Sequence, residues 1–299
     1  MKTTTIGIIG GGQLGRMLAM AAARLNFRAI ILEPQPDCPA AQLANSQIIA
    51  AYDDRPALAE LAKACDVVTF EFENVPVEAV RYLEKLVSVY PPPQALEVAQ
   101  DRLTEKQYLN ACGIPTADFR PVDSQADLER ALGEFGGRGV LKTRRLGYDG
   151  KGQIVFQAGD SAEGAFARLG GVPLILESFV PFVREISIIA ARGLDGKIEC
   201  FDPPENVHRN GILHTSTVPA AISTAVAERA RDAALRLLAA LDYVGVLGIE
   251  FFVAGDDTLV ANEIAPRVHN SGHWTEAAAI ISQFEQHIRA VGNLPLGDP

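Results

Sequence analysis

Short apolar runs alternate with helical patterns over the first ninety residues of the chain. The apolar runs are rich in β-branched residues and occupy positions 5–9, 29–32, 47–50, 66–70 and 87–90. Between them, apolar residues recur at helical spacing over 13–25, 55–64 and 77–86. Strands that alternate with helices in this way are typical of βαβ units around a parallel sheet.

The pattern changes after Pro91-Pro92-Pro93. Three consecutive prolines remove backbone donors and favour an extended chain, so we expect a domain boundary or crossover here. Helical patterns follow at 102–111, 125–135 and 224–241, and strand patterns at 139–143, 153–156, 174–179, 185–192 and 197–201. This second part of the chain is therefore predicted to be α+β.

Composition and charge exclude several classes of protein. Of 299 residues, 48% are hydrophobic and 21% are charged, which excludes intrinsic disorder, collagen and coiled coil. The formal net charge of −10 argues against a nucleic-acid partner, because phosphate contacts need a broad basic face. Local basic clusters remain able to bind a small anion.

The cysteines and the apolar stretches point to the cytoplasm. Cys38, Cys65, Cys112 and Cys200 form no CxxC pair or zinc-like cluster and are expected to be reduced thiols. Charged residues interrupt the most apolar stretch, 233–254, and no run is long enough to span a membrane. We expect neither a membrane partner nor an export signal.

A glycine-rich segment, residues 10–15, follows the first predicted strand and opens the first predicted helix. It matches the turn in which glycines let the backbone approach a pyrophosphate at a helix N-terminus. Glu33 follows the second strand, where an acid that binds ribose would lie. Two interpretations stay open, a dinucleotide site or a tight βαβ turn that needs glycine whatever the domain binds.

A second loop is both basic and rich in glycine. Four cations and three glycines fall within the eleven residues from Lys142 to Gly152. Flexible backbone amides flanked by Lys and Arg suit a loop that folds over nucleotide phosphates. It is not a Walker loop, because no Ser or Thr follows Lys151. A solvated hairpin with ordinary surface charges is the alternative.

Two apolar segments near the C-terminus, 248–254 and 258–264, flank Gly255-Asp256-Asp257 and are predicted to form a β-hairpin. With Asp256-Asp257 as a two-residue turn, Glu250 lies directly opposite Glu263. Like charges at opposed positions destabilise a sheet unless a cation neutralises them. Oxygen ligands at this spacing suit magnesium, which would bring nucleotide phosphates with it. A shifted register or a pair of solvated acids is the alternative.

The loop after Glu263 concentrates polar groups. Arg267, His269, Asn270 and His273 fall within seven positions. A loop of this composition can hold a small oxyanion, and its position beside a predicted metal site favours a functional role.

Five segments in this order resemble the ATP-grasp enzymes, and the resemblance narrows to the 5-(carboxyamino)imidazole ribonucleotide synthase family of purine biosynthesis. They are 10–17, 70–74, 101–106, 141–152 and 262–273, so the resemblance covers nearly the whole chain. It implies that ATP phosphorylates bicarbonate to carboxyphosphate. The amine of aminoimidazole ribonucleotide would then capture the carboxyl group.

The resemblance also implies roles for individual residues. Those that would bind ATP are Arg102, Lys142, Gly147, Tyr148, Asp149, Gly150, Lys151, Gly152, Glu177, Ser178, Phe179, Val180, Glu185, His208, Asn262 and Glu263. Those that would bind the ribonucleotide are Gln13, Leu14, Glu73, Asn74, Asp149 and Asn270. The catalytic set would be Arg267, His269 and Lys142, and the magnesium ligands Glu250 and Glu263. Many ATP-grasp enzymes place Asn where this chain has Ala265, so Asn262 is the alternative third ligand.

The implied fold is an N-terminal Rossmann-like βαβ domain (1–92) followed by a two-subdomain ATP-grasp fold. The small subdomain (93–174) would carry the glycine-rich loop, and the large one (175–299) the metal-binding hairpin. Members of the family continue beyond the position of Pro299, so the resemblance implies that their C-terminal region is absent here. It further implies Mg²⁺ as cofactor, ATP as co-substrate, bicarbonate and aminoimidazole ribonucleotide as substrates, and a homodimer.

Three alternatives remain. The formate-dependent glycinamide ribonucleotide transformylase shares the fold and a similar Glu-x-x-Pro-Arg ending, although segments 10–17 and 70–74 favour the synthase. An NAD-dependent oxidoreductase leaves the paired glutamates and the basic loop unexplained. A nucleotide-binding regulatory subunit would be free to lose Arg267, His269 and the metal ligands.

Overall fold

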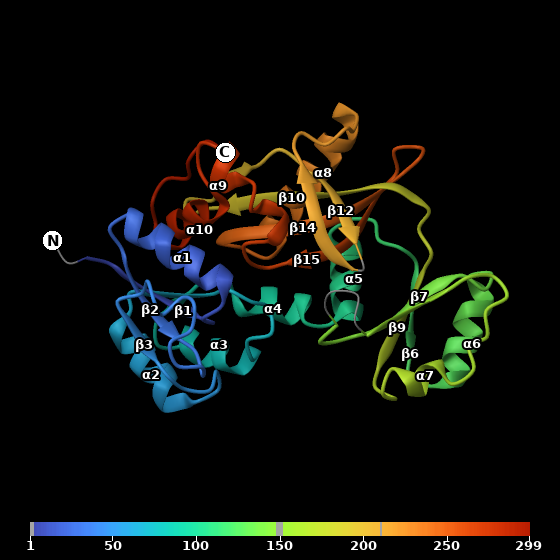
Figure 1. The fold of residues 1–299 in the computed structure, drawn as a ribbon, viewed down its shortest axis with the longest axis horizontal. Helices are drawn as coiled ribbons and strands as arrows, with labels where there is room; N and C mark the ends of the chain where they lie inside the picture. The colour runs from blue at the N-terminus through green and yellow to red at the C-terminus, as the bar shows by residue number, and fades with distance from the viewer. Residues whose placement is uncertain (1–2, 148–151, 210) are drawn as a thin grey trace.

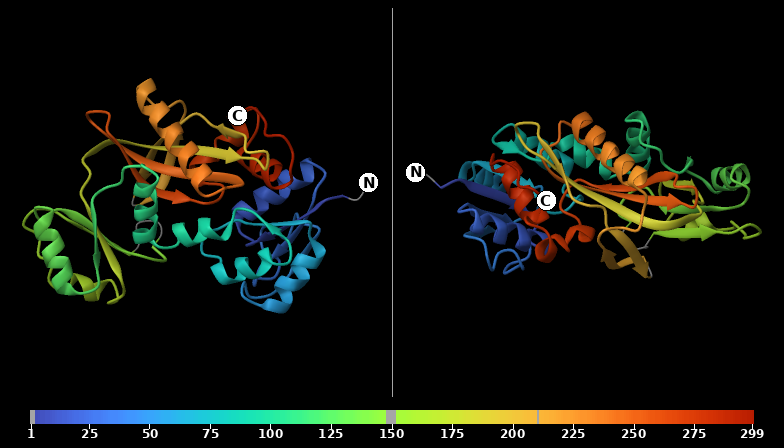
Figure 2. Two further views of the ribbon diagram at one scale, coloured as in Figure 1. Left: turned by 180° about the vertical axis from the view of Figure 1, so that it is seen from behind. Right: turned by 90° about the horizontal axis from the view of Figure 1, so that it is seen from above.

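The computed structural model describes residues 3–147, 152–209 and 211–299, and these form three β-sheets with helices packed against them (Figures 1 and 2). None of the helices in these ranges is long and apolar enough to cross a membrane.

The N-terminal sheet is parallel, as its alternating pattern predicts. Its strand order is β3-β2-β1-β4-β5, with β1 (Thr5–Ile9), β2 (Arg28–Leu32), β3 (Ser46–Ile48), β4 (Val67–Phe70) and β5 (Ser88–Val89). Its connecting helices are α1 (Gln13–Arg24), α2 (Arg55–Ala64) and α3 (Val77–Glu84). Apolar residues of α2 and α3 pack on one face and those of α1 on the other. Because both faces are covered, every residue of β1 is buried.

The proline run starts a helix that the sequence pattern does not predict. Pro92 is the N-cap of α4 (Pro93–Ala99), and Pro93 occupies the first helical turn, where a missing N–H is harmless. Leu96 packs into the N-terminal core, whereas Ala95 and Val98 pack into the core of the C-terminal part. This helix therefore joins the two parts rather than separating them.

A four-stranded antiparallel sheet follows, in the order β6-β9-β7-β8. Its strands are β6 (Phe119–Val122), β7 (Gly139–Thr143), β8 (Gln153–Phe156) and β9 (Leu174–Ser178), and its helices are α6 (Gln125–Glu134) and α7 (Ala165–Arg168). The sheet and its helices enclose a small core of their own and lie at one end of the molecule in Figure 1. Since β9 pairs with β6 and β7, this sheet extends to Ser178, beyond the expected limit at residue 174.

The largest sheet is antiparallel, in the order β13-β12-β10-β14-β15, with β11 paired to β10. Its strands are β10 (Phe182–Arg192), β11 (Ile198–Cys200), β12 (Glu205–Arg209), β13 (Ile212–Thr217), β14 (Gly245–Ala254) and β15 (Leu259–Ala265). Helices α5 (Arg102–Ala111) and α8 (Thr224–Ala240) pack on one face. The chain ends in η1 (Asn270–Gly272), α9 (Thr275–Ala278) and α10 (Gln283–Val291).

One half of the other face of this sheet packs against a hydrophobic core, and the other half lines a cavity. Along β10, Ile189 and Ala191 belong to the core that α1 and α10 share with the N-terminal sheet. Earlier on the same strand and the same face, Glu185 lines a cavity and Ser187 is fully buried beside it. Docking of the N-terminal domain on half of the sheet thus leaves the other half as the floor of a cleft.

His287 of α10 joins the two parts of the molecule. The ring is fully buried, its Nδ1 accepts the Val246 N–H of β14 at 3.1 Å, and its Nε2 lies 2.8 Å from Thr69 Oγ1 of β4. An N–H can only donate, so Nδ1 carries no proton and Nε2–H donates to Thr69. The imidazole is therefore neutral, and burial lowers its pKa to about 4.

Candidate active site

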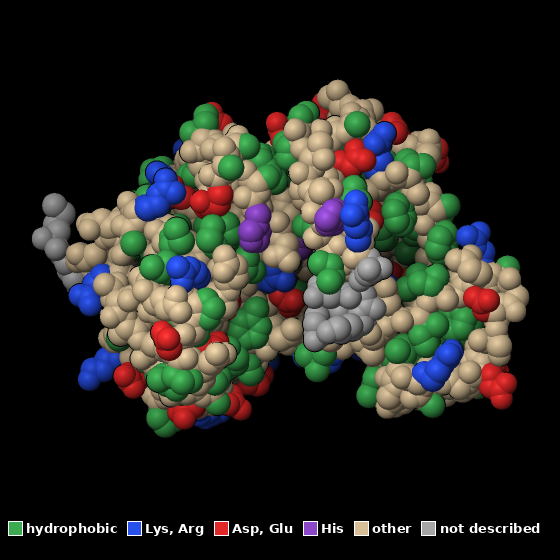
Figure 3. All heavy atoms as spheres, viewed as in Figure 1, with side chains coloured by type: hydrophobic (Ala, Val, Ile, Leu, Met, Phe, Trp, Pro, Cys, Tyr) green, Lys and Arg blue, Asp and Glu red, His purple; other side chains and the backbone are tan. Residues whose placement is uncertain are grey.

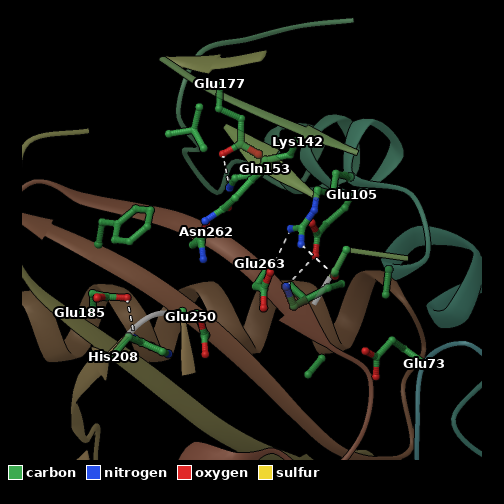
Figure 4. A pocket seen from close by; sticks show the side chains of 18 of the residues that line it. Glu73, Glu105, Lys142, Gln153, Glu177, Glu185, His208, Glu250, Asn262 and Glu263 are labelled. Atoms are coloured by element: carbon green, nitrogen blue, oxygen red, sulfur yellow. Dashed lines mark hydrogen bonds and ion pairs between the residues drawn. The ribbon is translucent and has the colours of Figure 1, made fainter. Parts of the chain in front are cut away.

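A cavity of about 460 Å³ lies where the three sheets meet. Its walls come from the segment after β4, from α5, from the four-stranded sheet and from β10, β12, β14 and β15. In the space-filling view, histidine and basic side chains gather near the centre of the face above this junction (Figure 3). Close up, Lys142 and Glu177 of one sheet face Glu250, Asn262 and Glu263 of the other (Figure 4).

Most of the residues predicted from the sequence line this one cavity. They are Glu73, Asn74, Arg102, Lys142, Gly147, Glu177, Ser178, Phe179, Val180, Glu185, His208, Glu250, Asn262, Glu263, Arg267, His269 and Asn270. The chain therefore brings together side chains up to almost two hundred positions apart, as in the Arg267–Glu73 ion pair.

Three predicted residues do not line the cavity. Gln13 is exposed at the start of α1, Leu14 packs against the core beneath that helix, and Gly152 lies just before β8. Tyr148, Asp149, Gly150 and Lys151 lie outside the described residues. The assignment of Gln13 and Leu14 to the ribonucleotide stays a prediction.

Glu250 and Glu263 face each other across β14 and β15, as predicted, but not by the predicted turn. The Ala254 N–H donates to Thr258 O at 2.9 Å, so the turn has three residues, with Asp257 at φ +65°. The longer turn displaces the register by one position, which sets Phe251 opposite Ala261. A β-bulge between Glu250 and Phe251, at Asn262 on the other strand, restores the register. The two-residue turn was therefore wrong, and the bulge explains why the opposed pair is still correct.

The paired carboxylates differ in their electrostatics. Glu263 receives an ion pair from Arg102 Nη1 at 3.0 Å. Burial would raise the pKa of Glu263, but Arg102 outweighs it and lowers that pKa to about 2. Burial, and then the charge of Glu263, raises the pKa of Glu250 to about 7. Arg102 thus favours the ionised form of Glu263, whereas burial and the charge of Glu263 disfavour the ionised form of Glu250.

The donor set fits a magnesium ion. Asn262 Oδ1 is buried beside the two carboxylates with no hydrogen-bond partner among the described residues. No group of three or more His, Cys, Asp and Glu with metal-binding geometry occurs in the same part of the chain. Magnesium in nucleotide sites is commonly held by one or two carboxylates plus substrate phosphates, so two glutamates and an amide oxygen are sufficient. The bulge at Asn262 places the amide there.

Three buried charges meet on the opposite wall. Glu177 Oε2 lies 2.9 Å from Lys142 Nζ and 3.3 Å from Lys106 Nζ, and each of these side chains is at most 12% exposed. Burial lowers the pKa of Lys142, whereas the two ammonium groups outweigh burial and lower the pKa of Glu177. Two lysines against one carboxylate, with Arg102 nearby, leave an excess of positive charge that suits phosphate groups.

Sequence reasoning missed two residues of this wall. Lys106 is almost fully buried and also donates to Asn262 O at 3.2 Å. Glu105 Oε1 accepts the Ile264 N–H at 2.7 Å, which ties α5 to the strand that carries Glu263, and burial raises the pKa of Glu105 to about 8. Both lie in segment 101–106, and two adjacent charged residues in the middle of an amphipathic helix were the available signal.

Arg267 and His269 stand on the side of the cavity nearest the N-terminal domain. Arg267 Nε donates to Glu73 Oε2, and its Nη1 donates to Val268 O at 2.9 Å. Gln283 holds the backbone of His269 from both sides, accepting its N–H at 2.9 Å and donating to its C=O at 2.7 Å. Burial, and then the charge of Arg267, lowers the pKa of His269 to about 4, so its ring is neutral. The pair offers one permanent cation and one neutral imidazole.

The glycine-rich turn before α1 is filled by the protein itself. Both carboxylate oxygens of Glu71 accept backbone N–H groups, one from Gly12 and one from Gly15, and Glu33 Oε2 accepts the Gly11 N–H at 2.9 Å. A pyrophosphate in this turn would need the same N–H groups and would meet two carboxylates. The structure therefore favours the tight-turn interpretation over a dinucleotide site.

Comparison with known families agrees with this geometry. Residues 107–284 match the ATP-grasp domain, and residues 1–100 match the ribonucleotide synthetase preATP-grasp domain. Fold and site thus define the chain as an ATP-grasp protein.

Curated relatives and solved structures make the assignment specific. The chain is 66% identical to an N5-carboxyaminoimidazole ribonucleotide synthase of Brucella melitensis, over 99% of this chain and 82% of the relative. It is 52% identical to one of Pseudomonas aeruginosa, over 98% of this chain and 80% of the relative. The chain belongs to the N5-carboxyaminoimidazole ribonucleotide synthase family.

Two crystal structures match over nearly the whole chain. An ADP complex of an N5-carboxyaminoimidazole ribonucleotide synthetase has a TM-score of 0.96 at 43% identity, and the match covers 100% of this chain and 79% of the chain in that structure. The enzyme of Aspergillus clavatus, in complex with ADP and 5-aminoimidazole ribonucleotide, has a TM-score of 0.92 at 32% identity and covers 99% of this chain and 78% of its own.

Proposed function

We propose that this chain is an ATP-dependent carbon–nitrogen ligase that carboxylates the amine of 5-aminoimidazole ribonucleotide, with bicarbonate as the carbon source, in purine biosynthesis. One observation carries the proposal. A single cavity joins an opposed carboxylate pair and a buried lysine cluster to Arg267 and His269. Such a cavity can hold a nucleotide triphosphate at one end and a small oxyanion at the other, and the family relationship names the acceptor.

In the proposed reaction, a bicarbonate oxygen attacks the γ-phosphorus of ATP, and the bond to the bridging oxygen breaks to release ADP. The amine nitrogen of the ribonucleotide then attacks the carboxyl carbon of carboxyphosphate. The carbon–oxygen bond to phosphate breaks, and the nitrogen gives up a proton, for which the released phosphate is an acceptor. The first step transfers a phosphoryl group to an oxygen of bicarbonate, and the second transfers a carboxyl group from phosphate to an amine nitrogen. Negative charge builds up on oxygen in both, so positioning and charge stabilisation are the main tasks of the protein.

The residues divide these tasks. Arg102 and Lys142 would bind the phosphates of ATP, and Glu185 would bind its ribose. His208, whose Nδ1 lies 3.0 Å from Glu185 Oε2, would lie at the nucleotide pocket. Segment 177–180, at the end of β9, would receive adenine. Glu250, Glu263 and Asn262 would hold magnesium, which neutralises charge on the phosphates when bound.

Arg267 and His269 would hold bicarbonate and stabilise the charge that develops on carboxyphosphate. Glu73, Asn74 and Asn270 line the cavity near them and would bind the ribonucleotide. Burial of this end of the cavity would protect carboxyphosphate from water. Gln13, Leu14 and Asp149 belong to the ribonucleotide site in this proposal by family resemblance.

The test is ADP release measured with ATP, Mg²⁺, bicarbonate and aminoimidazole ribonucleotide, with each component omitted in turn. The proposal expects magnesium-dependent ADP formation that the ribonucleotide stimulates and that yields the carboxylated product. ADP formation that depends on formate instead of bicarbonate would favour the alternative function, that of a glycinamide ribonucleotide transformylase. Absence of ADP formation under all these conditions would favour a regulatory subunit.

A homodimer and a cytoplasmic location complete the proposal, and both rest on the family resemblance. Sedimentation equilibrium of the chain measures the first, and fractionation of the source cell measures the second.

A further inference from the structure

A row of buried polar side chains leads away from His269 across the large sheet. His269 Nδ1 lies 2.8 Å from Ser271 Oγ, which lies 2.6 Å from Ser187 Oγ of β10. Ser187 Oγ is 3.0 Å from Asn206 Nδ2 of β12, and Asn206 Oδ1 is 2.8 Å from Ser216 Oγ of β13. Ser187 and Ser271 are fully buried and Asn206 is 4% exposed, so this row has little access to water.

The direction of this row follows from one donor whose identity is certain. The backbone N–H of Ser271 points at His269 Nδ1, 3.3 Å away, and a backbone N–H can only donate. His269 Nδ1 is therefore an acceptor and carries no proton. A ring without a proton on Nδ1 is the neutral tautomer with its proton on Nε2.

Each further bond is then determined in turn. Ser271 Oγ faces an acceptor at His269 Nδ1, so its hydroxyl donates there and must accept from Ser187. Ser187 in turn donates to Ser271 and must accept from Asn206, which sets the amide nitrogen of Asn206 toward Ser187. The amide oxygen is left for the hydroxyl of Ser216. The hydroxyls of Ser187 and Ser271 each donate once and accept once, the Ser216 hydroxyl donates to the amide oxygen, and all three donate toward His269.

We propose that Ser271, Ser187 and Asn206 are positioning residues that hold His269 as a hydrogen-bond donor in the cavity. With Nδ1 occupied from behind, only Nε2–H faces the cavity, where it lies 3.5 Å from Glu250 Oε1. A nitrogen that already carries its proton cannot act as a general base. His269 therefore serves the reaction by donating, and no proton is removed from the ribonucleotide amine by this ring.

The donor role rests on the proposed function, because it requires an oxyanion in front of His269. Bicarbonate and carboxyphosphate both present anionic oxygens. A neutral imidazole N–H that is already oriented stabilises developing negative charge without reorganisation during the reaction. Arg267 supplies a full positive charge beside it. Arg267 therefore neutralises the oxyanion, and His269 orients it through a directed hydrogen bond.

The tautomer is measured directly by two-bond proton–nitrogen correlation NMR on protein labelled with ¹⁵N-histidine, at neutral pH and without substrates. The signal is assigned by its loss in His269→Asn. The proposal expects a protonated Nε2 and a bare Nδ1. A protonated Nδ1, whether in the other tautomer or in an imidazolium, would overturn it. This measurement needs no activity, so failure of the carboxylation reaction and failure of the tautomer are separate results.

Asn206→Asp tests the row without changing its size. A carboxylate accepts from Ser187 as well as from Ser216, so the proton of Ser187 turns away from Ser271. Because two hydroxyl oxygens 2.6 Å apart need one proton between them, Ser271 turns its own proton to Ser187. His269 Nδ1 then loses the hydroxyl bond and keeps only the backbone N–H of Ser271 at 3.3 Å. We expect kcat to fall about 10- to 100-fold, the range for groups that orient an active-site ligand, while KM for ATP is unchanged.

Two further variants complete the design. Ser187→Ala breaks the row at its centre and is expected to give a similar loss of kcat. Thr215→Ala changes an exposed neighbour of Ser216 on β13 that takes no part in the row, and it should leave kcat unchanged. Wild-type kcat in both Asn206→Asp and Ser187→Ala would overturn the positioning role. If neither variant folds, the wild-type NMR measurement still decides the tautomer.

Discussion

The buried imidazole of His287 makes a sharp prediction about stability and pH. The ring accepts from Val246 and donates to Thr69, and its pKa is lowered to about 4, against 6.5 for an exposed histidine. Between these two pKa values the imidazole is protonated in the unfolded chain and unprotonated in the folded chain. Stability therefore rises with pH across this window and falls as pH is lowered through it.

The size of the effect follows from the shift. At 1.36 kcal/mol per pKa unit, a shift of about 2.5 units corresponds to about 3.4 kcal/mol in full, and to about 3 kcal/mol between about pH 8 and pH 4. Other acids and bases also titrate over this range. Comparison with a variant that lacks only this imidazole removes their contribution.

The perturbation is His287→Asn, which keeps an acceptor near Val246, cannot reach Thr69 and does not titrate. At about pH 8 we expect the variant to be less stable by about 1–3 kcal/mol, because a buried hydroxyl loses its partner. The difference should shrink by about 3 kcal/mol as pH falls to about 4, so that the two curves meet or cross.

Urea unfolding of both proteins over this pH range measures the difference. Fluorescence of Trp274, the one tryptophan of the chain, reports on the core that contains α10. A difference in unfolding free energy that stays constant with pH would refute the assignment of a neutral, buried His287.

Three further predictions concern the cavity. Glu263→Gln keeps the size of the side chain but removes the charge opposite Glu250. The rate of ADP formation should fall at least about 100-fold at any magnesium concentration. The control variant Asp256→Asn, in the adjacent turn, should leave that rate unchanged. Arg267→Lys keeps the charge but loses the Nε bond to Glu73, and kcat should fall by about 100-fold with KM for ATP unaffected, so a rise in KM for ATP alone would contradict the proposed role. Glu71→Gln places an amide N–H₂ against one of the two backbone N–H groups that donate to the carboxylate. Thermal unfolding should show a loss of about 1–3 kcal/mol of stability. Equal stability of the variant and the wild type would contradict a stabilising role for these two hydrogen bonds.

Local patterns in the sequence were sufficient for most of the regular structure. The parallel sheet, α2, α5, β7 and β8 follow from patterns of apolar residues that each lie within about a dozen positions. The structure adds that Asp54 and Asp101 cap α2 and α5 through their own side chains. Strands β12 and β13 were missed because their residues are largely polar and exposed, so no apolar alternation marks them.

The hairpin shows how a correct pairing can be reached through a wrong turn. Counting outward from Asp256-Asp257 pairs Glu250 with Glu263, but the structure combines a three-residue turn with a bulge at Asn262. The bulge has no local signal, because it depends on what lies across the strand and on the face of the sheet. Its consequence is chemical, since it adds the amide of Asn262 to the two carboxylates in the cavity.

The glycine-rich turn shows the reverse case, in which a strong local motif did not decide its own function. Residues 10–15 are compatible with a pyrophosphate until Glu71, some sixty positions away, is brought into the same turn. The sequence by itself determined the family, the main elements and the set of chemical groups, because these depend on local spacing and on residue identity. Only the tertiary structure decided which carboxylate meets a cation, which meets a backbone N–H and which nitrogen of His269 faces the cavity, because these depend on contacts between segments that the chain alone does not place side by side.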